Sequence, residues 1–168
     1  MATYIQIGST VTVGAGGAAS IDFTSITGSY TDLVIKASLR TDYASSNDWV
    51  KISFNSVTTN LSQRNLYGTG SAANSSSDTV IYLGIDGASA TASTFGNTEF
   101  YIPNYAGSTN KCLSADSVSE NNATAARTDL AAGLWSNTAA ITAIKLAPYG
   151  GTIFAQYSTA SLYGISKS

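Results

Sequence analysis

The chain has 168 residues, of which 43% are hydrophobic and only 11% are charged. A chain of this length and hydrophobic content can bury one substantial core, so we expect a single domain over residues 1–168. The net charge is −2 and the eight Lys and Arg residues are scattered, which argues against a nucleic-acid partner. No stretch approaches the roughly 18 apolar residues that span a membrane, and the first residues lack a signal-peptide pattern. We therefore expect no membrane partner, and synthesis in a reducing cytoplasm.

Apolar and polar residues alternate with a period of two along most of the chain, which is typical of strands that are buried on one face. In chain order, this pattern predicts strands at 5–13, 33–40, 49–54, 79–86, 98–103, 111–118, 128–135, 140–147 and within the closing stretch 152–165. Two windows, 60–67 and the Ala-rich 121–135, could instead form short helical turns. Because turn-forming clusters separate the strands, we expect an all-β fold: an antiparallel β-sandwich, jelly-roll-like, with about eight to ten strands.

Three segments between the predicted strands carry turn or loop signals. Gly-containing turns at 106–109 and 148–151 each predict a hairpin, since Gly adopts positive φ without a Cβ clash. Residues 58–78 have no clear periodicity and end in GTGSAANSSSD, so we expect a long surface loop there. This segment carries Arg64, Leu66 and Tyr67, which makes it a candidate contact region.

The closing stretch TIFAQYSTASLYGI, residues 152–165, places large apolar residues on both parities. Ile153 and Tyr163 are odd-numbered, whereas Phe154 and Leu162 are even-numbered. One straight strand cannot bury both sets on a single face. We therefore expect either two covered faces, or a bend near 158–159 that moves the chain to a new pairing.

Conventional catalytic chemistry finds little support in the sequence. The absence of histidine excludes Ser-His-Asp and Cys-His catalysis and histidine general bases. Cys112 lies in an alternating strand pattern, so we expect a buried structural thiol. The GAGGAA run at 14–19 fits a loose dinucleotide fingerprint, but a strand pattern follows where that fingerprint needs a helix. Nothing in the sequence places Glu99 opposite Glu120 as a hydrolytic pair, and we expect no catalytic residues and no enzyme activity.

Ligand-binding side chains are likewise sparse. Asp116, Glu120 and Asn121 could contribute oxygens to Ca²⁺, although they lack the spacing of an EF-hand, so the sequence leaves Ca²⁺ binding open and predicts no defined metal site and no cofactor. Tyr43 and Trp49 lie on either side of Asp48, and such rings could stack on a sugar. Strand packing accounts for them better, because the spacing of the aromatic residues fits β-strands.

The stretches YIPNYAGS, residues 101–108, and FAQYSTASLYGI, residues 154–165, resemble small β-rich virion proteins of tailed bacteriophages. The resemblance implies a structural role as a capsid decoration protein, a head fibre or a tail fibre, and it carries no catalytic or ligand residue over. The chain lacks the heptads or long repeats of a fibre shaft, which favours a decoration or cement protein that stabilises the capsid shell. A tail-associated receptor-binding or carbohydrate-binding module, with a glycan as its partner, is the alternative.

The expected partners follow from that role. They are further copies of this chain, most simply as a homotrimer, and the major capsid protein or another virion protein, which places the mature protein in the virion. Because the polar surface must consist of short Ser, Thr and Asn side chains, ordering it at a permanent contact costs little entropy. The first strand and the 58–78 segment are the expected contact regions, with four candidate interface residues chosen because interfaces are enriched in Arg and aromatic residues. These are Trp49, Arg64, Tyr67 and Tyr105.

Overall fold

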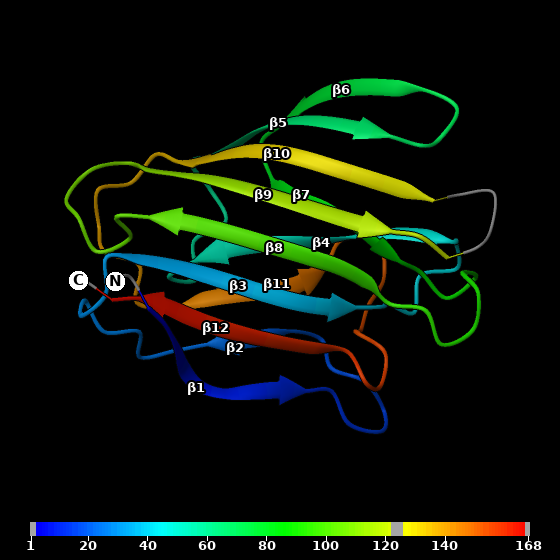
Figure 1. Ribbon diagram of the computed structural model, residues 1–168, viewed down its shortest axis with the longest axis horizontal. Coiled ribbons are helices and arrows are strands. Elements are labelled where there is room, and N and C mark those ends of the chain that lie inside the picture. The colour runs from blue at the N-terminus through cyan, green and yellow to red at the C-terminus, as the bar shows by residue number, and fades with distance from the viewer. Residues whose placement is uncertain (1–2, 122–125, 167–168) are drawn as a thin grey trace.

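A computed structural model describes residues 3–121 and 126–166, which form twelve β-strands in two antiparallel sheets (Figure 1). The eight-stranded sheet contains, in spatial order, β1 (Tyr4–Thr12), β12 (Thr159–Ile165), β3 (Asp32–Leu39), β8 (Gly96–Pro103), β9 (Lys111–Ser119), β10 (Arg127–Trp135), β5 (Leu61–Gly68) and β6 (Ala73–Asp78). The four-stranded sheet contains β2 (Ile21–Phe23), β11 (Ile144–Pro148), β4 (Asn47–Phe54) and β7 (Ile81–Asp86). The predicted antiparallel β-sandwich is confirmed, but this strand order does not confirm a jelly roll. The described residues contain no helix able to span a membrane.

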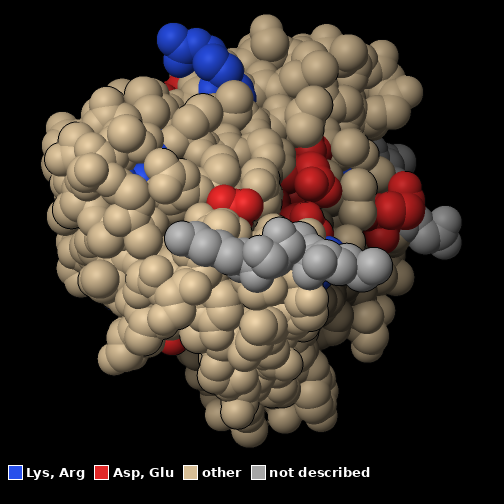
Figure 2. Space-filling model, turned by 60° about the vertical axis from the view of Figure 1, so that its left-hand side comes forward, with Lys and Arg blue, Asp and Glu red and all other residues tan. Residues whose placement is uncertain are grey.

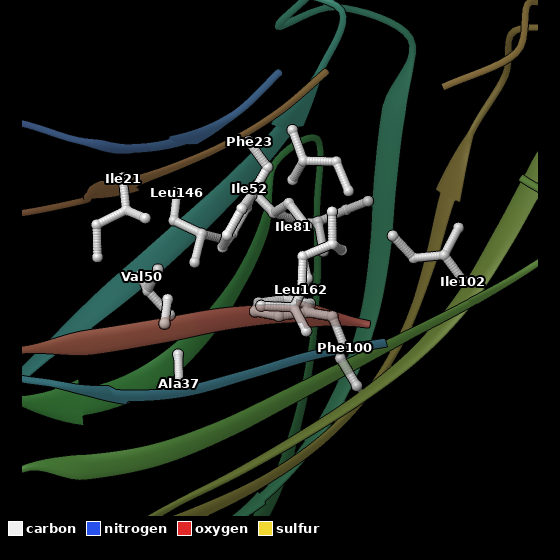
Figure 3. Close-up of a cluster of buried hydrophobic side chains, with 14 of the residues drawn as sticks. Ile21, Phe23, Ala37, Val50, Ile52, Ile81, Phe100, Ile102, Leu146 and Leu162 are labelled. Atoms are coloured by element: carbon white, nitrogen blue, oxygen red, sulfur yellow. The ribbon is translucent and has the colours of Figure 1, made fainter. Parts of the chain in front are cut away.

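The core lies between the two sheets, as the alternating pattern predicts. In β4 the even-numbered residues Val50, Ile52 and Phe54 are buried. Phe100 and Leu162 of the opposite sheet belong to the same cluster of buried side chains as Val50 and Ile52 (Figure 3). Burying each such side chain contributes about 1.5–3 kcal/mol, so the burial of these alternating apolar residues is the main force that holds the two sheets together.

The prediction of a surface loop over 58–78 is wrong. Residues 61–68 and 73–78 form the hairpin β5–β6, in which Tyr67 pairs with Asn74. Two of the inward-facing residues of β5 are polar, Gln63 and Asn65, so the strand has no apolar alternation for sequence reasoning to detect. This hairpin also raises the strand count above the eight to ten expected.

Neither suggested helical turn forms in the described residues. Residues 60–67 lie almost wholly in β5 and 127–135 are β10, where Ala131 faces the core. Residues 122–125 of the second window lie outside the described residues.

Of the two predicted hairpins, one forms. β8 and β9 pair directly across the turn that contains residues 106–109. The second hairpin is wrong: after β11 the chain leaves the four-stranded sheet, and Asp48 accepts hydrogen bonds from the amides of Gly150 (2.9 Å) and Gly151 (3.0 Å). Residues 152–157 therefore have no pairing with β11.

The closing stretch bends, as one of the two alternatives predicts. Phe154 is fully buried and bridges to Ala18 and Thr41, and Tyr157 then adopts a φ of 73°. From Thr159 the chain runs as β12 between β1 and β3. Phe154 and Leu162 are both buried in the core, whereas Tyr163, the next residue of β12, faces outward against Tyr4.

Candidate functional site

The outer face of the eight-stranded sheet carries a shallow groove of about 670 Å³ over β9, β10, β5 and β6. Its floor is apolar, since Leu130 and Leu66 lie directly opposite each other on neighbouring strands and are 59% and 55% exposed. Serines of β6, Ser75 and Ser77, form one wall. Exposed leucines paired across a sheet and rimmed by short polar side chains are typical of a protein-binding surface.

Two opposite charges flank these leucines. Arg64 lines the groove, and within the described part of the chain its guanidinium donates only to the Gln63 carbonyl (3.0 Å) and makes no ion pair. On the other side, Asp116 of β9 lies directly opposite Leu130 in the register of the sheet. Burial, and then the Glu99 carboxylate, raise the pKa of Asp116 above its usual range. Asp116 forms no ion pair among the described residues, because the nearby Lys36, whose charge partly offsets the rise in the pKa of Asp116, pairs with Glu99 instead (2.6 Å).

Charges are scarce elsewhere on the molecule as well. Figure 2 shows one face that is mostly uncharged, with acidic side chains near its middle and right side and a basic group at its top edge. The exposed leucine pair, with Arg64 and Asp116 beside it, therefore lies in a surface that is otherwise poor in charge.

Among the predicted interface residues, Arg64 lines the groove, whereas Trp49 and Tyr67 pack around Arg127. The Arg127 guanidinium carbon lies 3.7 Å from the Tyr67 ring centroid and 5.8 Å from that of Trp49. Because Trp49 belongs to β4 and Tyr67 to β5, these contacts join the two sheets. Both rings are half-buried, so their role as interface residues stays a prediction.

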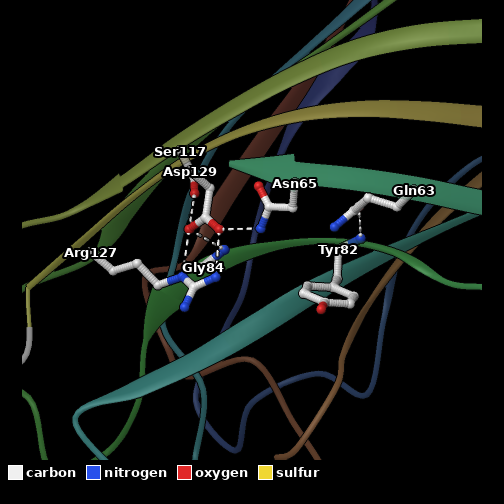
Figure 4. A network of polar contacts seen from close by, with 7 residues as sticks. All are labelled: Gln63, Asn65, Tyr82, Gly84, Ser117, Arg127 and Asp129. Atoms are coloured by element: carbon white, nitrogen blue, oxygen red, sulfur yellow. Dashed lines mark hydrogen bonds and ion pairs between the residues drawn. The ribbon is translucent and has the colours of Figure 1, made fainter. Parts of the chain in front are cut away.

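Arg127 is held by a network that spans the sandwich (Figure 4). Its Nε and Nη2 donate to the two carboxylate oxygens of Asp129 at 2.8 and 2.7 Å, and Asn65 donates to the same carboxylate at 2.6 Å. The Gly84 amide of β7 donates to Asp129 as well, at 3.3 Å. A Cβ on Gly84 would lie 2.7 Å from Asp129, so the absence of a side chain at this position is what lets the network lie against β7.

The prediction of Tyr105 as an interface residue is wrong, because its side chain is fully buried. Asn104 adopts a φ of 49°, and the turn carries the Tyr105 ring inward. There its hydroxyl donates to the Thr27 carbonyl and accepts from the Tyr30 amide (3.3 Å), and burial raises its pKa.

A second aromatic group lies on the outer face of the four-stranded sheet. The rings of Trp49, Tyr82 and Tyr149 lie 5.4–6.2 Å apart, and the Lys51 ammonium lies 5.8 Å from the Tyr149 ring centroid. This aromatic cluster replaces the grouping of Tyr43, Asp48 and Trp49 considered from the sequence, since Asp48 is buried.

The remaining candidates do not assemble into a site. Cys112 is exposed on the outer face, so the expectation of a buried thiol is wrong: the register turns its neighbours Lys111 and Leu113 inward. Asp116 and Asn121 are separated too, because Asp116 faces the groove side while Asn121 is buried at the end of β9. The described residues contain no group of three or more His, Cys, Asp or Glu side chains that could hold a metal ion.

Fold and groove together define an antiparallel β-sandwich with a candidate protein-binding face. Comparisons with protein-family models, curated proteins and solved structures found no match.

Proposed function

We propose that this protein is a non-enzymatic structural protein that binds other protein subunits through the groove over β9, β10, β5 and β6. The observation that carries the proposal is the exposed pair Leu66 and Leu130, flanked by the unpaired charges of Arg64 and Asp116. Burying one exposed leucine contributes at most about 1.5–3 kcal/mol, so the two leucines can supply a large part of a binding energy. An acidic group opposite Arg64 and a basic group opposite Asp116 would fix the orientation of the partner.

The resemblance to virion proteins of tailed bacteriophages gives this binding a setting. In that setting the protein is a decoration or cement protein in the virion, and its partners are the major capsid protein or another virion protein. It acts by mass action. A protein that binds the assembled shell and not its separated subunits shifts the equilibrium toward the assembled shell without any chemical reaction. A homotrimer suits a lattice position, since symmetry repeats each contact.

The test measures attachment to shells that lack the protein. We expect the wild type to bind at a copy number comparable to that of the capsomers and to raise the temperature at which the shell disrupts. The double variant Leu66→Ser/Leu130→Ser should lose both effects. Tyr157→Ser is the matched control, because it removes an exposed apolar side chain outside the groove and should bind normally. Normal attachment of the leucine double variant, or a few copies confined to the tail, would refute this role.

A receptor-binding or carbohydrate-binding module is the second candidate, and the aromatic cluster of Trp49, Tyr82 and Tyr149 favours it. The exposed ring of Tyr149, beside the half-buried rings of Trp49 and Tyr82, provides a stacking surface for a sugar, and Lys51 provides a donor for its hydroxyl or carboxylate groups. A glycan array should then show a ligand whose binding is lost in Tyr149→Ala and kept in Leu66→Ser. An array without any ligand would exclude this candidate and leave the groove proposal standing.

A further inference from the structure

Three aspartates of the described chain are buried, and two of them have partners for both carboxylate oxygens. Asp48 accepts from the Thr41 hydroxyl (2.7 Å) and from two backbone amides. Asp129 is paired with Arg127 through both of its oxygens. Asp86, at the end of β7, is different: its Oδ2 atom has no hydrogen-bond partner in the described structure.

The partners of the other Asp86 oxygen are all neutral. Oδ1 accepts from the Ser119 hydroxyl and from Asn121 Nδ2 (3.2 Å). No Lys or Arg in the described segments forms an ion pair with Asp86. An isolated carboxylate with an unsatisfied oxygen is costly to bury, by several kcal/mol, unless a positive charge compensates it.

A second unsatisfied oxygen belongs to the side chain that contacts Asp86. Asn121 is 1% exposed, and its Oδ1 atom has no hydrogen-bond partner in the described structure. Since Asn121 Nδ2 donates to Asp86 Oδ1, the two unsatisfied oxygens belong to one hydrogen-bonded pair of side chains. Both unsatisfied atoms are acceptors, and a bound cation can satisfy acceptors of this kind and compensate the carboxylate charge at the same time.

More oxygens and both sheets meet at this point. Asn47 of β4 lies directly opposite Asp86 in the four-stranded sheet, and its Oδ1 accepts a hydrogen bond from Ser119 of β9 (3.4 Å). Carboxylate, amide and hydroxyl oxygens from β4, β7 and β9 therefore gather where the four-stranded and eight-stranded sheets meet. Ca²⁺ accepts six to eight oxygen ligands in flexible geometry, including amide and backbone carbonyls, whereas Mg²⁺ requires a near-ideal octahedron.

We propose that Asp86 and Asn121, with Asn47, bind one calcium ion that neutralises the buried carboxylate and ties β7 to the end of β9. Asp86 supplies the charge through Oδ2, and Asn121 supplies a neutral ligand through Oδ1. This site is independent of the groove and of the proposed function, so either proposal can fail without the other.

The test compares thermal unfolding of the full chain after EDTA treatment, with and without CaCl₂, and measures stoichiometry by isothermal titration calorimetry. We expect one Ca²⁺ per chain and a saturable rise in Tm of roughly 5–10 °C at a hundredfold excess over the dissociation constant. MgCl₂ should give a smaller rise. Asp86→Asn should unfold at a higher temperature than the EDTA-treated wild type, because the uncompensated charge is gone, and should no longer respond to Ca²⁺.

Asp116→Asn is the matched control, since it removes the same charge from the outer face of β9 and should keep the full Ca²⁺ response. Asn121→Asp adds a second carboxylate and should tighten Ca²⁺ binding at least tenfold, which provides a second test if Asp86→Asn does not fold. A wild type that shows no saturable response to Ca²⁺ would overturn the proposal. So would an undiminished response in Asp86→Asn or an unchanged affinity in Asn121→Asp.

Discussion

Replacing Arg127 with Met tests whether the ion pair that Arg127 and Asp129 form within β10 is a buried or a surface interaction. The substitution keeps an unbranched side chain of similar reach but removes both hydrogen bonds to Asp129, which are 2.8 and 2.7 Å long. The Asp129 side chain is fully buried and that of Arg127 is 11% exposed, so water cannot replace the lost donors. The variant therefore leaves a buried carboxylate without its countercharge.

The expected cost follows from what Asp129 loses and what it keeps. Breaking a buried pair by removing one partner costs about 3–5 kcal/mol. Hydrogen bonds from Asn65 (2.6 Å) and the Gly84 amide (3.3 Å) remain and favour the lower end of that range. Loss of the guanidinium stacked on Tyr67 adds about 0.5–2 kcal/mol. We expect a total near 3–5 kcal/mol, which lowers Tm by roughly 6–20 °C for a chain of this length.

Urea unfolding of the single variants Arg127→Met and Asp129→Asn and of the double variant measures this cost. The cycle should give a coupling free energy of at least about 2 kcal/mol, because the double variant no longer buries an unpaired charge. Lys36→Met is the control, since Lys36 and Glu99 form an ion pair of similar length whose side chains are 53% and 36% exposed. It should cost less than about 1 kcal/mol. An Arg127→Met cost equal to that of the control would refute the view that this network ties the sheets together.

Three further predictions concern other parts of the sandwich. Gly84→Ala places a Cβ 2.7 Å from Asp129 and should destabilise the protein by about 1–3 kcal/mol in urea unfolding, whereas an unchanged midpoint would mean that the network can move away from β7. Burial raises the pKa of Asp116 above 3.8, and the native state then binds the proton more tightly than the unfolded state, so stability should fall as pH rises through the folded-state pKa. Asp116→Asn should remove that fall and gain up to about 1 kcal/mol at pH 7, and identical pH profiles of variant and wild type would contradict this. Deleting residues 160–168 removes the strand between β1 and β3 and should abolish cooperative thermal unfolding, while a variant that ends at Ile165 should melt like the full chain.

The sequence predicts the fold where burial follows the apolar pattern. In β3 and β4 apolar residues at every second position face the core, so alternation alone locates these strands. The pattern fails for β5, because its inward-facing Gln63 and Asn65 are polar and are stabilised by groups from β7 and β10. Those partners lie far away in the sequence, so no pattern within residues 61–68 predicts them.

The candidate site was only partly predictable for a related reason. Enrichment of Arg at interfaces singles out Arg64, which does line the groove. Leu66 and Leu130 become a site only through the register that sets them side by side, and register between β5 and β10 depends on the whole sheet. For Tyr105 the same enrichment gave a wrong prediction. Aromatic residues are common at interfaces, but the turn that contains Tyr105 places its ring in the core.

The three buried aspartates explain how a chain with so few charges fixes the arrangement of its parts. Asp48 holds the segment after β11, and Asp129 joins β10 to β7. Asp86 joins β7 to the end of β9. In a low-dielectric interior each carboxylate tolerates only the arrangement that supplies its partners, so each excludes alternative placements of the segments that it joins. Asp48 and Asp129 meet that condition with groups of the chain itself. Asp86 lies at a similar junction but keeps an unsatisfied oxygen, and a cation bound there would supply the missing partner of its carboxylate.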